Sequence, residues 1–143
     1  MAEALNCRCM CGAVTFSAAP ERMTMGVCHC SMCRRWSGGA YMAVGCGESV
    51  EFADGAPVTT FDSSAWAERL FCAKCGSTLV WQIKGGKHQS VSAQAFEDPS
   101  VFEFRSQIFF DEKPSNFDFA NETRNMTGAE VMAIYAPKSE GAQ

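Results

Sequence analysis

Cysteines in short clusters are the residues of this sequence best suited to chemistry. Nine cysteines occur among 143 residues, and most of them fall into three groups. The groups are Cys9-Met10-Cys11, the hexapeptide Cys28-His29-Cys30-Ser31-Met32-Cys33, and Cys72-Ala73-Lys74-Cys75. Close spacing of this kind is typical of thiolate ligands to a metal ion, above all zinc.

The N-terminal segment bears on whether these cysteines are thiols or disulfides. Residues 1–6 contain neither a basic stretch nor an apolar run, so we expect no secretory signal and a cytoplasmic location. Disulfides are rare in that reducing compartment. We therefore interpret the cysteine groups as metal ligands rather than as crosslinks.

The first and third groups together supply the four ligands that a structural zinc ion requires. These ligands are Cys9, Cys11, Cys72 and Cys75. Four thiolates leave no open position on the metal, and Gly76 allows the sharp backbone turn of a zinc knuckle. Cys7 extends the first group to three cysteines, so the residues alone leave open which two of them bind. A redox Cys-x-x-Cys is the alternative, but such motifs belong to βαβ units, which this sequence lacks.

The middle group places three thiolates within six residues. They belong to Cys28, Cys30 and Cys33. Three ligands from one loop can occupy one face of a metal ion and leave the fourth position for water or substrate, as in catalytic zinc sites. A thiol that enters this position would bind as a thiolate, because the metal lowers its pKa. The group therefore predicts a catalytic zinc ion and a small-molecule thiol as the substrate.

Other interpretations of the middle group stay open. A fourth ligand could enclose the metal, and His29, Cys7 and Cys46 are the candidates. Alternatively, the three thiols could sense redox state through reversible disulfides. Cys46 stands alone between two glycines and fits a buried bystander better than a ligand. His29 could face the solvent or transfer protons in a reaction.

Short β-compatible segments must position these cysteines. We expect strands at residues 14–17, 23–27, 40–44, 50–52, 58–61, 68–71, 77–83, 89–93 and 104–109, separated by turn-forming residues. The first two should pair as a hairpin, as should the strands within 77–93, and the middle cysteines should lie in a loop or a single turn. A short helix is expected over 127–135. Without a linker or repeat, residues 1–143 should form one zinc-binding domain, an all-β sandwich or partly open barrel.

Charge and hydropathy exclude two classes of partner. The net charge is -4, and basic residues cluster only at Arg34-Arg35, so we expect no nucleic-acid surface. No segment approaches the run of about 18 apolar residues that a membrane span requires, so we expect no membrane partner.

Three motifs, taken in order, resemble those of the glutathione-dependent formaldehyde-activating family. They are Cys9-x-Cys11-Gly12-Ala13-Val14, Cys28-His29-Cys30-Ser31-Met32-Cys33-Arg34 and Phe71-Cys72-x-x-Cys75-Gly76-Ser77, and the resemblance covers roughly residues 6–110. It implies an all-β zinc fold related to a Rab GTPase exchange factor. It also implies that the structural ligands are Cys9, Cys11, Cys72 and Cys75, and that Cys28, Cys30 and Cys33 are catalytic and hold a second zinc ion.

The resemblance further implies carbon–sulfur chemistry. The family's named reaction adds glutathione to formaldehyde and gives S-hydroxymethylglutathione, which is a carbon–sulfur lyase reaction in the synthetic direction. We therefore expect a zinc-dependent carbon–sulfur lyase or synthase that acts on a thiol adduct, with glutathione as a candidate substrate. The alternative hypothesis is a non-catalytic zinc module that binds a protein partner or senses thiol or redox state.

Overall fold

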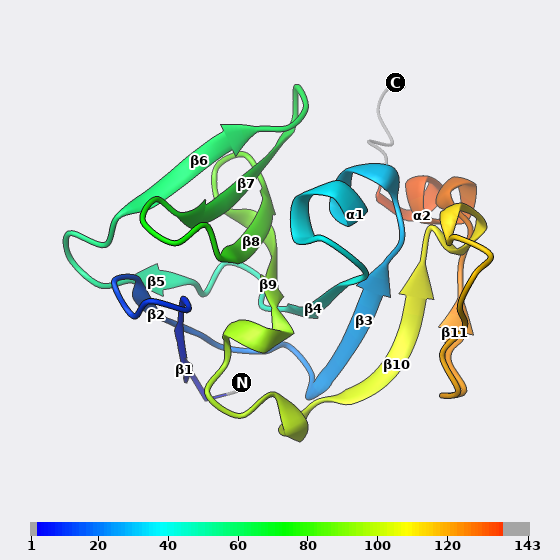
Figure 1. Ribbon diagram of the computed structural model, residues 1–143, viewed down its shortest axis with the longest axis horizontal. Coiled ribbons are helices and arrows are strands. Elements are labelled where there is room, and N and C mark those ends of the chain that lie inside the picture. The colour runs from blue at the N-terminus through cyan, green and yellow to red at the C-terminus, as the bar shows by residue number, and fades with distance from the viewer. Residues whose placement is uncertain (1–2, 136–143) are drawn as a thin grey trace. The chain divides into compact units, whose positions relative to one another are not determined.

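The computed structural model describes residues 3–135, which are mostly β (Figure 1). The strands are β1 Leu5–Arg8, β2 Thr15–Ala18, β3 Thr24–Cys28, β4 Tyr41–Gly45, β5 Glu51–Phe52, β6 Val58–Asp62, β7 Ala67–Cys72, β8 Thr78–Ile83, β9 Lys87–Ser92, β10 Glu103–Ile108 and β11 Arg124–Asn125. The helices are α1 Ser31–Ser37 and α2 Gly128–Tyr135, with 3-10 turns η1 Ala93–Ala95, η2 Pro99–Val101 and η3 Phe110–Glu112. The expected all-β class is confirmed, and the described strands form open sheets rather than a closed barrel.

Contacts divide the chain into two compact units. Among the described residues, the first unit contains 3–25 and Met42–Glu103, and the second contains Gly26–Tyr41 and 104–135. The cysteines of the first and third groups fall in the first unit, and the middle group falls in the second. One zinc-binding domain over residues 1–143 stays a prediction.

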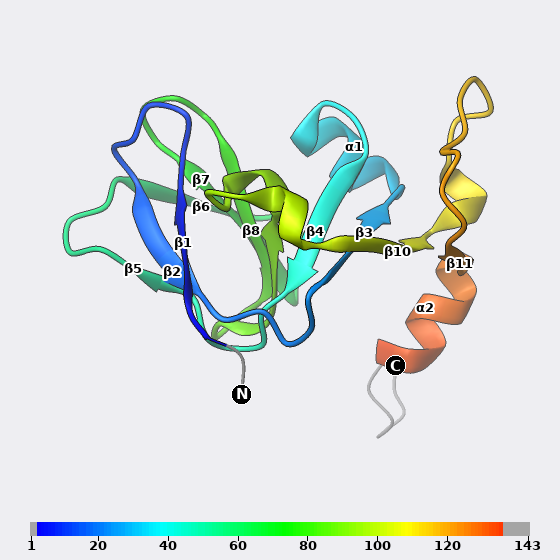
Figure 2. The same cartoon turned by 90° about the horizontal axis from the view of Figure 1, so that it is seen from below.

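Antiparallel strands build the first unit (Figures 1 and 2). One sheet has the order β1-β2-β5, and β4-β9-β8-β7-β6 are successive neighbours in the other. The expected hairpin of β8 and β9 is confirmed, with Val80 opposite Val91. The expected hairpin of β2 and β3 is wrong, because β1 and β5 take the two edges of β2. The sequence analysis did not anticipate β1.

The core of the first unit surrounds the turns that carry the cysteines. Val14, Leu79 and Val91 have no exposed surface, and Phe16 packs on Phe52 with ring centroids 5.0 Å apart. Cys9 and Cys72 belong to the same buried cluster, along with Cys7 and Cys46. Burial of apolar side chains is the main force that holds such a core together, so the turns have a fixed base.

The second unit is built on β3 and β10, which are neighbours, with β11 parallel to β10. Helix α1 follows β3 directly and ends at Gly38, whose φ of 81° is that of a left-handed cap. Helix α2 confirms the helix expected over 127–135. Thr127 and Glu130 form a capping box, in which the side chain of each accepts a hydrogen bond from the backbone N–H of the other, at 3.2 and 2.8 Å. Neither helix in the described part of the chain is long and apolar enough to span a bilayer.

Candidate metal centres

Four cysteine sulfurs converge in the first unit. They belong to Cys9, Cys11, Cys72 and Cys75, and all four Sγ atoms lie within 4.8 Å of one another. The Sγ atoms of Cys9 and Cys11 are 3.6 Å apart, and those of Cys11 and Cys72 are 3.9 Å apart. Tetrahedral zinc with Zn–S bonds of about 2.3 Å would separate its sulfurs by about 3.8 Å. The donor set and its spacing therefore fit a closed four-thiolate metal site.

Two tight turns supply these sulfurs with backbone donors. The turn between β1 and β2 directs the N–H of Val14 to Cys9 Sγ at 3.3 Å and the N–H of Ala13 to Cys11 Sγ at 3.5 Å. In the turn between β7 and β8, the N–H groups of Lys74 and Cys75 point at Cys72 Sγ, at 3.3 and 3.4 Å. Such N–H···S bonds stabilise thiolates and fix their direction.

The thiol of Cys75 ionises readily in this environment. Ser77 Oγ lies 3.1 Å from Cys75 Sγ. Hydrogen bonding from the Ser77 side chain, aided by backbone N–H groups, lowers the pKa of Cys75 to about 5. A thiolate present at neutral pH is the form that binds a metal ion.

Cys7 and Cys46 lie apart from the four converging sulfurs of the first unit. Cys7 is 2 % exposed, and its Sγ is 3.8 Å from the carbonyl oxygen of Leu5. Cys46 Sγ donates to the carbonyl oxygen of Val44 at 3.5 Å. Burial raises the pKa of each thiol to about 12. In the Cys-x-Cys-x-Cys stretch, the structure thus gathers Cys9 and Cys11 and places Cys7 in the core.

Three sulfurs converge in the second unit. The Sγ atoms of Cys28, Cys30 and Cys33 lie within 4.8 Å of one another, and the described residues place no fourth Cys, His, Asp or Glu in this group. Cys28 ends β3, Cys30 is the N-cap of α1, and Cys33 lies in its first turn. The sequence analysis expected a loop or single turn here. The helix forms because Cys30 Sγ accepts the N–H of Cys33 at 3.3 Å, in the manner of a capping serine.

Electrostatics of the three-cysteine group favour a bound cation. Hydrogen bonding to Cys30 and Cys33, together with burial, raises the pKa of the Cys28 thiol. Three clustered sulfurs resist simultaneous ionisation unless a positive charge compensates them. The chemistry of this donor set therefore fits a metal ion bound on one face.

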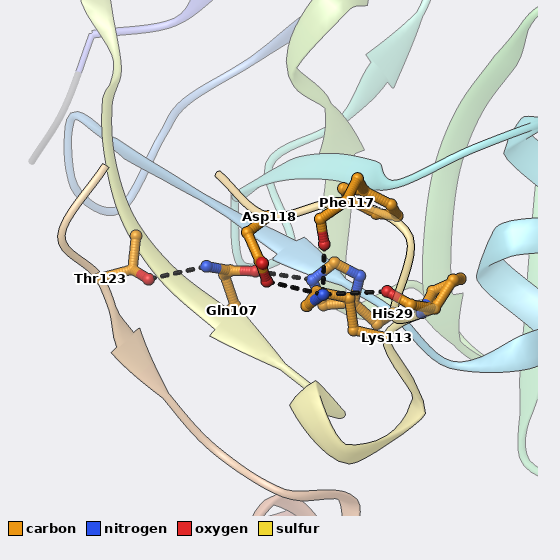
Figure 3. Close-up of polar contacts among 7 residues, drawn as sticks. His29, Gln107, Lys113, Phe117, Asp118 and Thr123 are labelled. Atoms are coloured by element: carbon orange, nitrogen blue, oxygen red, sulfur yellow. Dashed lines mark hydrogen bonds and ion pairs between the residues drawn. The ribbon is translucent and has the colours of Figure 1, made fainter. Parts of the chain in front are cut away.

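The sequence allowed His29 to face the solvent, but the structure buries it. Its side chain has no exposed surface, and its Nε2 lies 2.7 Å from Gln107 Oε1 (Figure 3). Arg34 Nε donates to the carbonyl oxygen of His29 at 3.0 Å, so this arginine braces the loop.

The residues that surround His29 were not predicted from the sequence. Gln107, Lys113 and Thr123 carry no motif, and the only local signal was the set of turn formers near Pro114. These three side chains also line a cavity of about 440 Å³ in the second unit. Contacts between distant segments, rather than spacing in the sequence, bring them together.

Comparison with known proteins places these features in context. The chain matches the family model of the glutathione-dependent formaldehyde-activating enzyme over residues 4–112. A Schizosaccharomyces pombe protein described as an uncharacterized lyase is 35% identical over 125 residues, which are 87% of this chain and 91% of that protein. The crystal structure of a Rhodobacter sphaeroides protein shares the fold with a TM-score of 0.58 at 22% identity, and the match covers 70% of this chain and 99% of that chain.

Proposed function

Because the chain belongs to the family of glutathione-dependent formaldehyde-activating enzymes, we propose that it is a zinc-dependent carbon–sulfur lyase or synthase that acts on a thiol adduct. The family match includes all three cysteine groups, and the similarity to a protein described as a lyase supports an enzyme of that class. The proposal adds the metal, the substrate class and a role for each cysteine.

The four converging sulfurs of the first unit are proposed to hold a structural zinc ion. The ligands are Cys9, Cys11, Cys72 and Cys75. Two turns far apart in the sequence supply them, so bound metal would tie β1 to β7. Structural zinc of this kind contributes folding free energy of roughly 10 to 16 kcal/mol, which is comparable to or larger than the net stability of a domain.

The three-cysteine group is proposed as the catalytic centre. The observation that carries this proposal is the convergence of Cys28, Cys30 and Cys33 Sγ within 4.8 Å, without a fourth protein ligand among the described residues. Zinc bound there would supply the positive charge that keeps thiolates, including that of an incoming thiol, ionised at neutral pH. The chain itself fixes the donors, because α1 presents Cys30 and Cys33 one turn apart.

The proposed reaction joins a thiol such as glutathione to a small aldehyde such as formaldehyde. A carbon–sulfur bond forms at the carbonyl carbon, the carbon–oxygen π bond breaks, and the thiol proton ends on the oxygen as a hydroxyl group. The reverse direction cleaves the adduct. We propose the cytoplasm as the compartment, because cysteines gathered in short clusters suit metal ligation and glutathione keeps thiols reduced there.

The test compares wild type with Cys30→Ser, and with Cys46→Ser as a control outside both groups. Zinc content and glutathione binding by calorimetry are measured on each protein purified under reducing conditions, and adduct formation is followed by NMR. We expect two zinc ions in wild type and the control, and about one in Cys30→Ser, which should stay folded but lose thiol binding and activity. One zinc ion in every protein, without thiol binding, would contradict the enzyme and favour a non-catalytic zinc module.

A further inference from the structure

We infer that His29 is a positioning residue for the three-cysteine loop, residues 28–33, and that the segment 113–125 holds it in place. This segment lies beyond the family match, which ends at residue 112. The inference rests on the proposed function in one respect, namely that the loop binds the second metal ion. Every residue involved belongs to the second unit.

Hydrogen bonds fix the backbone of the loop around His29. The N–H of His29 donates to the carbonyl oxygen of Ile108 at 3.1 Å, and its carbonyl oxygen accepts from Arg34. Two residues on, the N–H of Ser31 donates to Glu112 Oε1 at 3.0 Å. Cys28 and Cys30 are the immediate neighbours of His29, so any movement of its backbone displaces two of the three sulfurs.

The imidazole of His29 is the first link of a directed chain of hydrogen bonds (Figure 3). Gln107 Nε2 donates to Thr123 Oγ1 at 2.8 Å, as Figure 3 shows. The Thr123 hydroxyl in turn donates to Asn125 Oδ1 at 2.7 Å. Gln107 therefore presents its amide oxygen to the imidazole. Because an amide oxygen only accepts, His29 Nε2 carries the proton and donates it. The chain of hydrogen bonds thus connects the loop, across β10, to β11.

Three phenylalanine rings hold the imidazole from the side. The rings of Phe110, Phe117 and Phe119 have centroids 6.2, 6.1 and 6.3 Å from that of His29. Two of these residues lie in the segment 113–125. The imidazole therefore has little freedom to turn while this segment is in place.

Lys113 fixes the part of the segment that carries two of these rings. Its side chain is 8% exposed, and its Nζ donates to the carbonyl oxygens of Pro114 and Phe117. The same ammonium group forms an ion pair with Asp118 at 2.9 Å. Figure 3 shows the contacts of Lys113 with Phe117 and Asp118. A single buried cation thus shapes the turn that brings Phe117 and Phe119 to the imidazole.

The second nitrogen of the imidazole shows that the ring does more than fill space. His29 Nδ1 is buried and makes no hydrogen bond within the described residues. A buried polar atom without a partner lowers stability, so a phenylalanine would suit a pure packing role better. The bond at Nε2 accounts for a histidine at this position. Residues behind a metal ligand that orient it in this way commonly change metal affinity 10- to 100-fold when they are replaced, as an order of magnitude.

The test uses three substitutions and a matched control. His29→Phe keeps the ring packing but removes the donor, His29→Gln restores an N–H at the place of Nε2, and Thr123→Val breaks the chain outside the loop. Gln82→Leu is the control, because it removes two hydrogen bonds of a buried amide in the first unit, one donated to Glu68 at 2.7 Å and one accepted from Gln89 at 2.9 Å. Metal release to a chromophoric chelator is followed under native conditions, and cobalt(II) spectra report the thiolate geometry. Metal release from two sites should give two kinetic phases, and the phase that is absent in Cys30→Ser is the one that belongs to the loop.

We expect His29→Phe to accelerate metal release from the loop by roughly 10- to 100-fold and to shift its cobalt(II) spectrum. Release from the four-cysteine site should not change, His29→Gln should recover most of the wild-type rate, and Thr123→Val should show a smaller effect of the same kind. Metal release from the loop that is unchanged in His29→Phe and Thr123→Val would overturn the inference. Faster release from both sites would overturn it too, because that is the result of general destabilisation, for which Gln82→Leu is the reference. If wild type holds only one metal ion, the proposed function fails, and the inference fails with it.

Discussion

The backbone N–H of Met10 donates a hydrogen bond of 2.9 Å to the hydroxyl of Ser77, 67 positions further along the chain. The same hydroxyl lies beside Cys75 Sγ. Since its oxygen already accepts from Met10, the hydroxyl proton is available to the sulfur. Ser77 therefore joins the two cysteine turns of the first unit and stabilises a thiolate at once.

Replacement of Ser77 by alanine should weaken the four-cysteine site. Ser77→Ala removes both hydrogen bonds, each with a net contribution of about 1 kcal/mol, and it removes the main cause of the lowered pKa of Cys75. We expect roughly tenfold faster zinc release from this site and a lower melting temperature. Ser49→Ala is the matched control, because its hydroxyl donates to the carbonyl oxygen of Cys46 rather than to a ligand sulfur. Equal zinc release in the two variants would refute the role of Ser77.

Loss of a ligand should have different consequences in the two groups. Cys72 has no exposed surface, and its Sγ accepts two backbone N–H groups at the end of β7. Cys72→Ser should therefore leave the protein unfolded or insoluble, since a structural zinc ion held there would contribute a free energy comparable to or larger than the net stability of the domain. Cys28→Ser should remove one zinc ion but keep a cooperative melting transition. Circular dichroism and zinc analysis distinguish these outcomes, and a stably folded Cys72→Ser would contradict the structural role.

A side chain at Gly76 should destabilise the protein, although there is space for one. Its φ is +80°, and no atom lies within 4 Å of a Cβ placed there. Gly76→Ala should therefore cost about 1 kcal/mol through backbone strain alone. Gly39 has equal space without a positive φ, so Gly39→Ala should be neutral or slightly stabilising. Urea unfolding of both variants measures the difference, and equal midpoints would contradict the explanation.

The buried thiol of Cys46 should make stability depend on alkaline pH. Burial, together with the negative charge of Glu21, raises the pKa of Cys46 from 9.0 to about 12. A thiol with a raised folded-state pKa stabilises the protein fully below the unfolded value, and this contribution is lost as the pH rises from 9 to 12. Melting temperatures over this range should fall less steeply for Cys46→Ala than for wild type. Parallel curves would show that Cys46 does not ionise on unfolding.

The sequence predicted most of the β architecture because alternation and turn residues are local signals. Residues 77–83 and 89–93 alternate and flank a glycine turn, and they form the expected β8–β9 hairpin. Strand β1 escaped notice because Leu5–Arg8 is short and polar, and its pairing with β2 is a tertiary choice. Helix α1 was not expected because a cysteine, rather than one of the usual capping residues, acts as its N-cap.

The same distinction between local signals and tertiary contacts applies to the candidate sites. Each cysteine motif has the spacing of metal ligands, so both groups could be located before any coordinates, although only the resemblance to the family selected Cys9 and Cys11 over Cys7. The support behind them could not be, because His29 and Gln107 are 78 positions apart and neither has a distinctive neighbour. From the sequence, Lys113 would be expected to lie on the surface, whereas the fold buries its side chain beside backbone carbonyl groups.

The short distance between Cys11 and Cys72 also concerns how the chain matures. Their sulfurs are 3.9 Å apart but lie 61 positions from each other in sequence. A disulfide that closed a loop of this length would restrict the unfolded chain by about 4 kcal/mol, and a shared zinc ion would impose a comparable restriction. Unlike a disulfide, a crosslink through zinc would need no oxidant and would open when the metal is removed. During synthesis, the first half of the site emerges dozens of residues before the second, so the folding of newly made protein would depend on the supply of zinc, whereas a chain closed by a disulfide depends on an oxidant.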